Sequence, residues 1–264
     1  MSPAATASFI AESDAIFAAL AVPPATPPAE LPFIRENHAA MTKMVACMAV
    51  NPTGTIDDDF VAMMVPHHQG AIDMAQAQLR YGHNEQLLRV AQEIVVVQLQ
   101  EIAAMRVAVG QKVSRSEVML AASGAGTPPT QPSSSSSDAG TVTSSLVAEA
   151  PFLEENNFAM TKMMRGMTIK PTGDINRDFV AMMVPHHEGA IDMAEAELRY
   201  GKSAELRRIA QEIIVDQMQE ITLMRLAVGE PLPPSASSPT DPLPASAFQA
   251  SPWMPVCGGC PSAR

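Results

Sequence analysis

The chain contains little of what several common protein classes require. It has three cysteines, Cys47 and the pair Cys257 and Cys260, which are too few to form a disulfide framework in 264 residues. Lysine and arginine total 17 against 28 acidic residues, giving a formal net charge of −11 and no basic stripe that could follow a phosphate backbone. We therefore expect no nucleic-acid partner.

Long apolar runs and a secretory leader are also missing. No stretch approaches the roughly 18 consecutive apolar residues that a membrane helix needs, so we expect no membrane span. The apolar run IFAALAV near the start is short, and the first basic residue, Arg35, follows it. The sequence therefore shows no recognisable export signal, and it does not assign a compartment.

Methionine is abundant, and much of it lies in a tandem duplication. The chain has 19 methionines, an unusual excess for a globular protein. The segment FVAMMVPHHQGAIDMA at 60–75 returns as FVAMMVPHHEGAIDMA at 179–194, and residues 33–109 align with 152–228 without a gap. The chain thus carries two copies of one unit, each with adjacent methionines and adjacent histidines.

Composition divides the chain into five segments. Residues 31–110 and 150–229 form repeats 1 and 2, and residues 1–30 form an N-terminal segment with room for one short helix. Serine and proline mark 111–149 as a flexible linker and 230–264 as a disordered tail that contains CGGC at 257–260. The CGGC spacing suits a small disulfide, a thiol pair or an accessory soft-metal clip, and the sequence leaves these open.

Each repeat has the periodicity of helices and no alternating pattern typical of strands. In repeat 1 the breakers predict helices over 31–50, 57–81 and 84–109, and Pro66 predicts a kink or a break in the second. We expect an all-α fold of two tandem up-down bundles with three to four helices each. Because about 80 residues make a thin core, the two repeats are expected to pack together.

Helical spacing predicts stripes of soft or imidazole side chains that face the bundle interior. The candidate metal ligands are the two histidine pairs and the methionines at helical spacing from them. In repeat 1 they are His67, His68, Met63, Met64, Met74, Met41, Met44 and Met48; in repeat 2 they are His186, His187, Met182, Met183, Met193, Met160, Met163 and Met167.

Thioether and imidazole together favour copper. Thioether sulfur is a neutral, soft ligand that suits Cu(I) and Ag(I), while imidazole binds copper in either common oxidation state, so Cu(II) is also considered. A closed zinc site would need more thiolates than the repeats contain. Methionine stripes are more often core than ligands, because methionine fills gaps in cores. We interpret the carboxylates as polar partners, not ligands. Glu101 and Glu220 would pair with Arg or Lys at the bundle edge, and Asp73 and Asp192 would orient a histidine.

Catalytic patterns are weak. Neither repeat has the paired Glu-x-x-His motifs of a di-iron bundle, and the histidines have no neighbouring Ser, Cys or Lys nucleophile. Gly70 and Gly189 are better explained by close helix packing than by a phosphate loop. We assign no catalytic residues and expect no enzymatic activity.

The motif DFVAMMVPHHQGAIDMA, followed by Leu-x-x-x-Ala-Gln-Glu-Ile and Gln-x-x-Glu-Ile, resembles the domain of unknown function 305 family, which includes CopM-like copper metallochaperones. The resemblance covers both repeats. It implies a ferritin-like bundle that binds copper or silver through methionine and histidine, and an exported, periplasmic protein that supports metal tolerance.

Three hypotheses follow. The first is a copper-binding protein that sequesters or delivers Cu(I), with a copper exporter or another copper carrier as its partner. The second is a structural or protein-interaction module whose methionine-rich faces are adaptable packing surface. The third is a ferritin-like, metal-dependent redox enzyme, since a fold does not determine its function.

Overall fold

A computed structural model describes residues 26–49, 51–113 and 139–231. Most of the N-terminal segment and of the linker lies outside these residues, as does the CGGC tail. Within them the chain is all-α, with six helices and no strand. Each repeat supplies three of the six, which confirms the predicted fold class at the lower of the two expected helix numbers.

The helices begin and end close to the predicted breakers. Repeat 1 forms α2 (Leu31–Met48), α3 (Ile56–Tyr81) and α4 (Glu85–Ala108), and repeat 2 forms α6 (Ala139–Gly166), α7 (Ile175–Tyr200) and α8 (Ala204–Ala227). The helix α6 begins inside the segment predicted as linker, which has no proline between residues 133 and 150 to stop it. The predicted linker is therefore shorter at this end.

Of the kink or break predicted at Pro66, the break does not occur. Both α3 and α7 run through their prolines, Pro66 and Pro185, as single helices. An internal proline removes one backbone hydrogen bond and costs about 3 kcal/mol or more. Burial of the methionines just before the proline and the histidines just after it offsets this cost. Each histidine pair therefore lies inside an uninterrupted helix.

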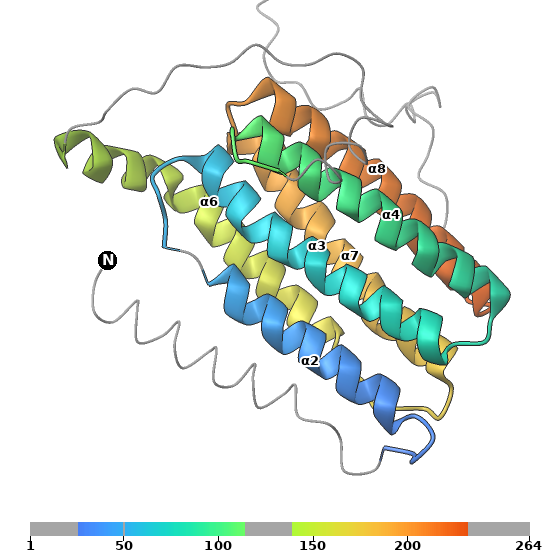
Figure 1. Ribbon diagram of the computed structural model, residues 1–264. Helices are drawn as coiled ribbons and strands as arrows, with labels where there is room; N and C mark the ends of the chain where they lie inside the picture. The colour runs from blue at the N-terminus through green and yellow to red at the C-terminus, as the bar shows by residue number, and fades with distance from the viewer. Residues whose placement is uncertain (1–25, 50, 114–138, 232–264) are drawn as a thin grey trace, which may run out of the picture. The chain divides into compact units, whose positions relative to one another are not determined.

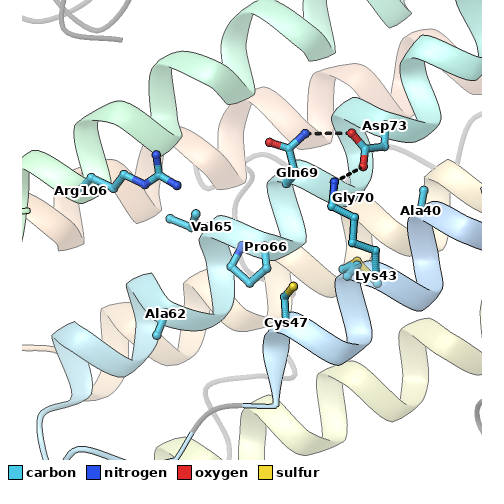
Figure 2. Close-up of a pocket in the computed structure, with 11 residues that line it drawn as sticks. Ala40, Lys43, Cys47, Ala62, Val65, Pro66, Gln69, Gly70, Asp73 and Arg106 are labelled. Carbon is cyan, nitrogen blue, oxygen red and sulfur yellow. Dashed lines mark hydrogen bonds and ion pairs between the residues drawn. The ribbon is translucent and has the colours of Figure 1, made fainter. Parts of the chain in front are cut away.

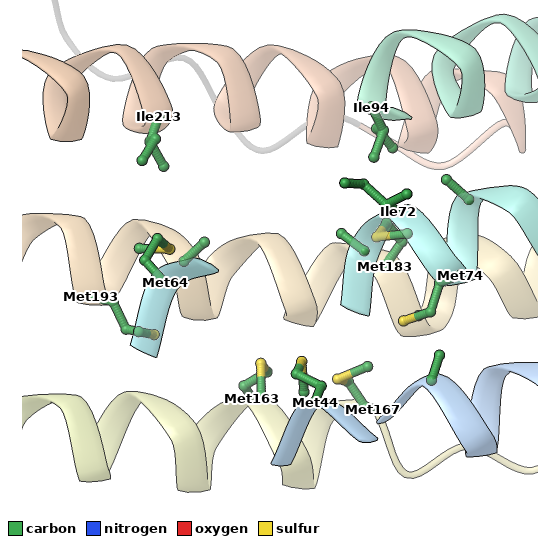
Figure 3. Packing of buried hydrophobic residues seen from close by; sticks show 14 of the residues in the cluster. Met44, Met64, Ile72, Met74, Ile94, Met163, Met167, Met183, Met193 and Ile213 are labelled. Carbon is green, nitrogen blue, oxygen red and sulfur yellow. The ribbon is translucent and has the colours of Figure 1, made fainter. Parts of the chain in front are cut away.

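The six helices form three layers (Figure 1). The helices α3 and α7 contact each other in the middle layer; α2 and α6 cover one side, and α4 and α8 form the other. The methionines of both repeats contribute to one continuous hydrophobic cluster, part of which is drawn in Figure 3. The predicted packing of the two repeats on each other is confirmed. No described helix is long and apolar enough to cross a membrane.

Buried acidic side chains form contacts between the two repeats, and we call each of these contacts a joint. Glu30, just before α2, accepts a hydrogen bond from the backbone N–H of Gly173 in repeat 2, and Glu149 does the same with Gly54 of repeat 1, each at 3.0 Å. Burial, followed by hydrogen bonding to an aspartate of the opposite repeat, raises the pKa of both glutamates to about 7. The aspartates are Asp178 and Asp59, respectively.

A further joint differs between the two halves. The Gln78 amide donates to Asn176 Oδ1 at 3.0 Å, whereas the equivalent positions hold Glu197 and Asp57. Burial and a hydrogen bond to Asp57 raise the pKa of Glu197 to about 9. One half thus holds a pair of neutral amides, and the other holds two carboxyls, of which Glu197 keeps its proton to about pH 9.

The glycine after α3 is explained by this joint and not by a left-handed cap. Gly82 has an ordinary φ of −73°, so the backbone does not require glycine there. A Cβ at Gly82 would lie 2.2 Å from Gln78 Nε2. The helix α3 ends at this glycine, as predicted, and the absence of a side chain there makes room for the joint.

Candidate metal centre

The two histidine pairs meet at the centre of the middle layer. They lie halfway along α3 and α7, which contact each other, and all four side chains are fully buried. We call His67 and His186 the inner histidines and His68 and His187 the outer histidines. Both histidines of each pair are buried, although their side chains point in different directions, because layers of helices cover α3 and α7 on two sides.

The inner histidines contact each other across the boundary between the repeats. The ring centroids of His67 and His186 are 4.0 Å apart, with the planes tilted by 48°. Burial, and then the charges of neighbouring histidines, hold the pKa of both well below its usual 6.5. Both imidazoles are therefore neutral at physiological pH, and each carries one nitrogen lone pair able to bind a metal ion.

Each inner histidine also contacts a methionine of the opposite repeat. His67 Nε2 lies 3.2 Å from Met163 Sδ on α6. His186 Nε2 lies 3.2 Å from Met44 Sδ on α2. The duplication thus places two imidazoles and two thioethers, in a reciprocal arrangement, at the interface of the repeats.

Glycines leave room for these two thioethers. A Cβ at Gly70 would lie 2.8 Å from Met44 Sδ, and a Cβ at Gly189 would lie 3.0 Å from Met163 Sδ. The contact at Gly70 is shorter than real Cβ atoms show and the one at Gly189 is tighter than most, so a larger residue at either position would require the sulfur to shift. The close helix packing predicted for both glycines is therefore confirmed, and it positions a methionine sulfur against each inner histidine.

The outer histidines pair with buried carboxylates. His68 Nε2 lies 2.9 Å from Glu101 Oε2 on α4, and His187 Nε2 lies 2.7 Å from Glu220 Oε2 on α8. The prediction of Arg or Lys partners for these glutamates is wrong, because their partners are the histidines. The histidine-orienting role predicted for Asp73 and Asp192 is also wrong, because they pair at the surface with lysines (Lys43 and Lys162).

Several buried polar atoms around the histidines have no hydrogen-bond partner among the described residues. They include Nδ1 of all four histidines and both amide atoms of Gln98 and Gln217. On α8, burial and then the charges of Glu101 and Glu220 raise the pKa of Asp216 to about 6. A buried polar atom left unpaired costs about 1–3 kcal/mol, so this region has unused capacity for a ligand or for water.

Most predicted methionine ligands lie elsewhere in the core. In the described part of the chain, Met44 and Met163 are the two methionines within hydrogen-bond distance of a histidine nitrogen. The others pack as core side chains, with Met160 partly exposed (Figure 3). They are Met41, Met48, Met63, Met64, Met74, Met160, Met167, Met182, Met183 and Met193.

The inner histidines, Met44 and Met163 meet at one place, whereas the sequence predicted a separate group of donors inside each repeat. The helical stripes predicted a lumen inside each three-helix unit, but α3 and α7 pack directly on each other. Each repeat therefore completes its histidine with a sulfur from the other. Within the described residues no three His, Cys, Asp or Glu side chains converge closely enough to hold a metal ion. The donors that do converge are imidazole nitrogen and thioether sulfur.

Comparison with known proteins identifies the family but no activity. No curated protein matches the chain. A crystal structure of a DUF305 fragment from Deinococcus radiodurans is similar at 24% sequence identity; the match covers 68% of this chain and 99% of that one, with a TM-score of 0.41. Residues 30–109 and 130–228 match the family described as a domain of unknown function (DUF305), and the chain therefore belongs to this family.

Proposed function

We propose that this protein binds Cu(I), with Ag(I) as a close mimic, at the centre formed by the inner histidines, Met44 and Met163. The observation that carries the proposal is the reciprocal contact of each inner histidine with a thioether of the other repeat, at 3.2 Å in both cases. Two neutral nitrogens and two neutral sulfurs form a donor set that suits a soft monovalent ion and suits Mg²⁺ or Ca²⁺ poorly.

The electrostatics of the centre support the same ion. A monovalent cation with neutral ligands brings one positive charge into the core, whereas a divalent ion brings two, and the desolvation cost of an ion rises steeply with its charge. The nearest carboxylates, Glu101 and Glu220, pair with the outer histidines. They can partly offset a single charge without being ligands.

The role that fits this site is sequestration or delivery of copper. All four donors are buried to 2% exposure or less, and no catalytic residue is assigned beside them. We propose that the protein performs no chemistry on a substrate and that copper is its cargo, as in the CopM-like proteins that its motifs resemble. A copper exporter or another copper carrier would then be the partner.

A metal-free helical scaffold is the alternative, and one observation favours it. A contact of 3.2 Å between Nε2 and Sδ also fits an N–H···S hydrogen bond, so the centre can be a packed core with satisfied Nε2 atoms. The Nδ1 atoms of the same rings lack a partner in both interpretations, as an acceptor when Nε2 donates to sulfur and as a donor when Nε2 binds the ion. The two functions differ in whether Cu(I) stabilises the fold, because a true ligand must stabilise the state that it binds.

An anaerobic Cu(I) titration against a chromophoric competitor tests the proposal. We expect one ion per chain in the helical domain, measured with Cys257 and Cys260 replaced by alanine. Replacing both inner histidines with glutamine should weaken binding by about 100-fold or more, since even ligand-orienting residues contribute 10- to 100-fold. A chain that binds no Cu(I), or that binds equally well without both histidines, would disprove the proposal.

Two buried methionines outside the centre provide the matched control. Met64 and Met183 occupy equivalent, fully buried core positions, and neither takes part in the two histidine–methionine contacts of the centre. Replacing them with leucine, which nearly conserves volume, should leave Cu(I) affinity unchanged. Replacing Met44 and Met163 with leucine should weaken it. Equal effects of the two pairs would indicate that methionine content, and not the centre, determines binding.

A further inference from the structure

A groove on the surface of repeat 1 reaches Met44, one of the proposed ligands. It lies between α2 and α3 and has a volume of about 280 Å³. Figure 2 shows its lining, with Cys47 and Pro66 on opposite walls and Gly70 deeper along α3. Met44, whose sulfur contacts His186, is part of the same lining. The groove thus connects solvent with a donor of the proposed metal centre.

Side chains with soft donor atoms lie in succession between the groove surface and the inner histidines. Cys47 is an exposed free thiol one turn of α2 away from Met44. Met44 Sδ lies 3.2 Å from His186 Nε2, and the ring of His186 lies against that of His67. Behind the sulfur, Nδ1 of the fully buried His186 has no partner among the described residues. The order from surface to centre is therefore thiol, thioether and imidazole.

Repeat 2 has no thiol at the position equivalent to Cys47. The residue that corresponds to Cys47 is Gly166, which has no side chain. A Cβ at Gly166 would lie 2.6 Å from Pro185 Cβ, so α6 and α7 leave no space for a thiol at this point. The groove of repeat 1 therefore has a thiol in its lining, and the equivalent position of repeat 2 has none.

We propose that the groove beside Cys47 is the route by which a soft monovalent ion reaches the buried centre, with the Cys47 thiolate as its first ligand. This inference rests on the proposed function. As the ion binds, the Cys47 S–H bond loses its proton to water and an S–metal bond forms. A bond from the ion to Met44 Sδ then replaces the bond to Cys47, and the thiolate recovers a proton.

Stopped-flow transfer of Cu(I) from a coloured competitor complex to the full chain tests this route. The reference protein lacks Cys257 and Cys260, so that Cys47 is the one thiol left. Adding Cys47→Ser should slow uptake by about tenfold or more, which corresponds to about 1.4 kcal/mol on the barrier, and should leave the final stoichiometry unchanged. Adding Ala62→Leu, which narrows the groove without removing a donor, should also slow uptake.

The outcomes separate the two proposals. If the reference protein takes up no Cu(I), the proposed function fails and the route fails with it. If it takes up Cu(I) with the dependence on the inner histidines given above, but either the Cys47→Ser or the Ala62→Leu protein loads at the reference rate, the route alone is overturned. Thermal melting of each variant without metal confirms that the fold is intact.

Discussion

The acidic joint between Glu197 and Asp57 should make stability depend on pH in a way that its amide counterpart does not. The pKa of Glu197 is raised from 4.5 to about 9, so the folded state holds a proton that the unfolded chain releases above pH 4.5. The stabilising contribution of the protonated joint is therefore complete below pH 4.5. It is lost progressively as pH rises towards 9.

The size of this effect follows from the pKa shift. Each pH unit above the unfolded pKa costs about 1.4 kcal/mol, so at pH 7.5 the penalty for this one group is of order 4 kcal/mol. Replacing Asp57 with Asn and Glu197 with Gln copies the Gln78–Asn176 pair of the other half and removes the titration. We expect the double variant to exceed the natural protein in unfolding free energy at neutral pH, and the two to converge in acid.

Urea unfolding followed by far-UV circular dichroism, repeated between about pH 5 and pH 8, measures this difference. The reverse exchange, Gln78→Glu with Asn176→Asp, is the matched control and should lower stability increasingly as pH rises. The other acidic joints are unchanged in all three proteins, so their contributions cancel in the comparison. A difference in unfolding free energy that stays constant with pH would refute the protonation of Glu197 in the folded state.

Two further predictions concern the centre itself. Gly70→Ala should lower the unfolding free energy by about 1–3 kcal/mol, because its Cβ would lie 2.8 Å from Met44 Sδ; a melting curve that matches the natural protein would contradict this packing. The lowered pKa of His67 and His186 means that their stabilising contribution is present above pH 6.5 and is lost as pH falls below it. Replacing both with glutamine should therefore reduce the acid sensitivity of the metal-free protein, and an unchanged acid transition would contradict their burial as neutral rings.

The helices could be predicted from the sequence because their limits are local. Pro52 and Gly54 end one helix and allow the next, and their equivalents do the same in repeat 2. At Gly54 the positive φ of 85° shows why glycine occurs there. Pro66 does not break α3, because tertiary packing offsets the lost backbone hydrogen bond. A local sequence pattern contains no information on that packing.

The centre was predicted only in part. Periodicity identified the histidines and methionines that face inward, but it cannot tell whether a stripe faces its own repeat or the other one. His67 therefore meets Met163, across 96 residues of sequence, and not a methionine of repeat 1. The sequence does contain a signal for the acidic joint. Asp57 corresponds to Asn176 and Glu197 corresponds to Gln78, so both members of the pair are carboxyls in one half and amides in the other.

A crystal structure of the chain loaded anaerobically with Ag(I) or Cu(I) would test the central claim most directly. We predict one anomalous-scattering peak within the helical domain, between the rings of His67 and His186 and within bonding distance of Met44 Sδ or Met163 Sδ. A peak at any other set of side chains in this domain, or no peak in loaded crystals, would contradict the proposal that the two repeats together form a soft-metal centre.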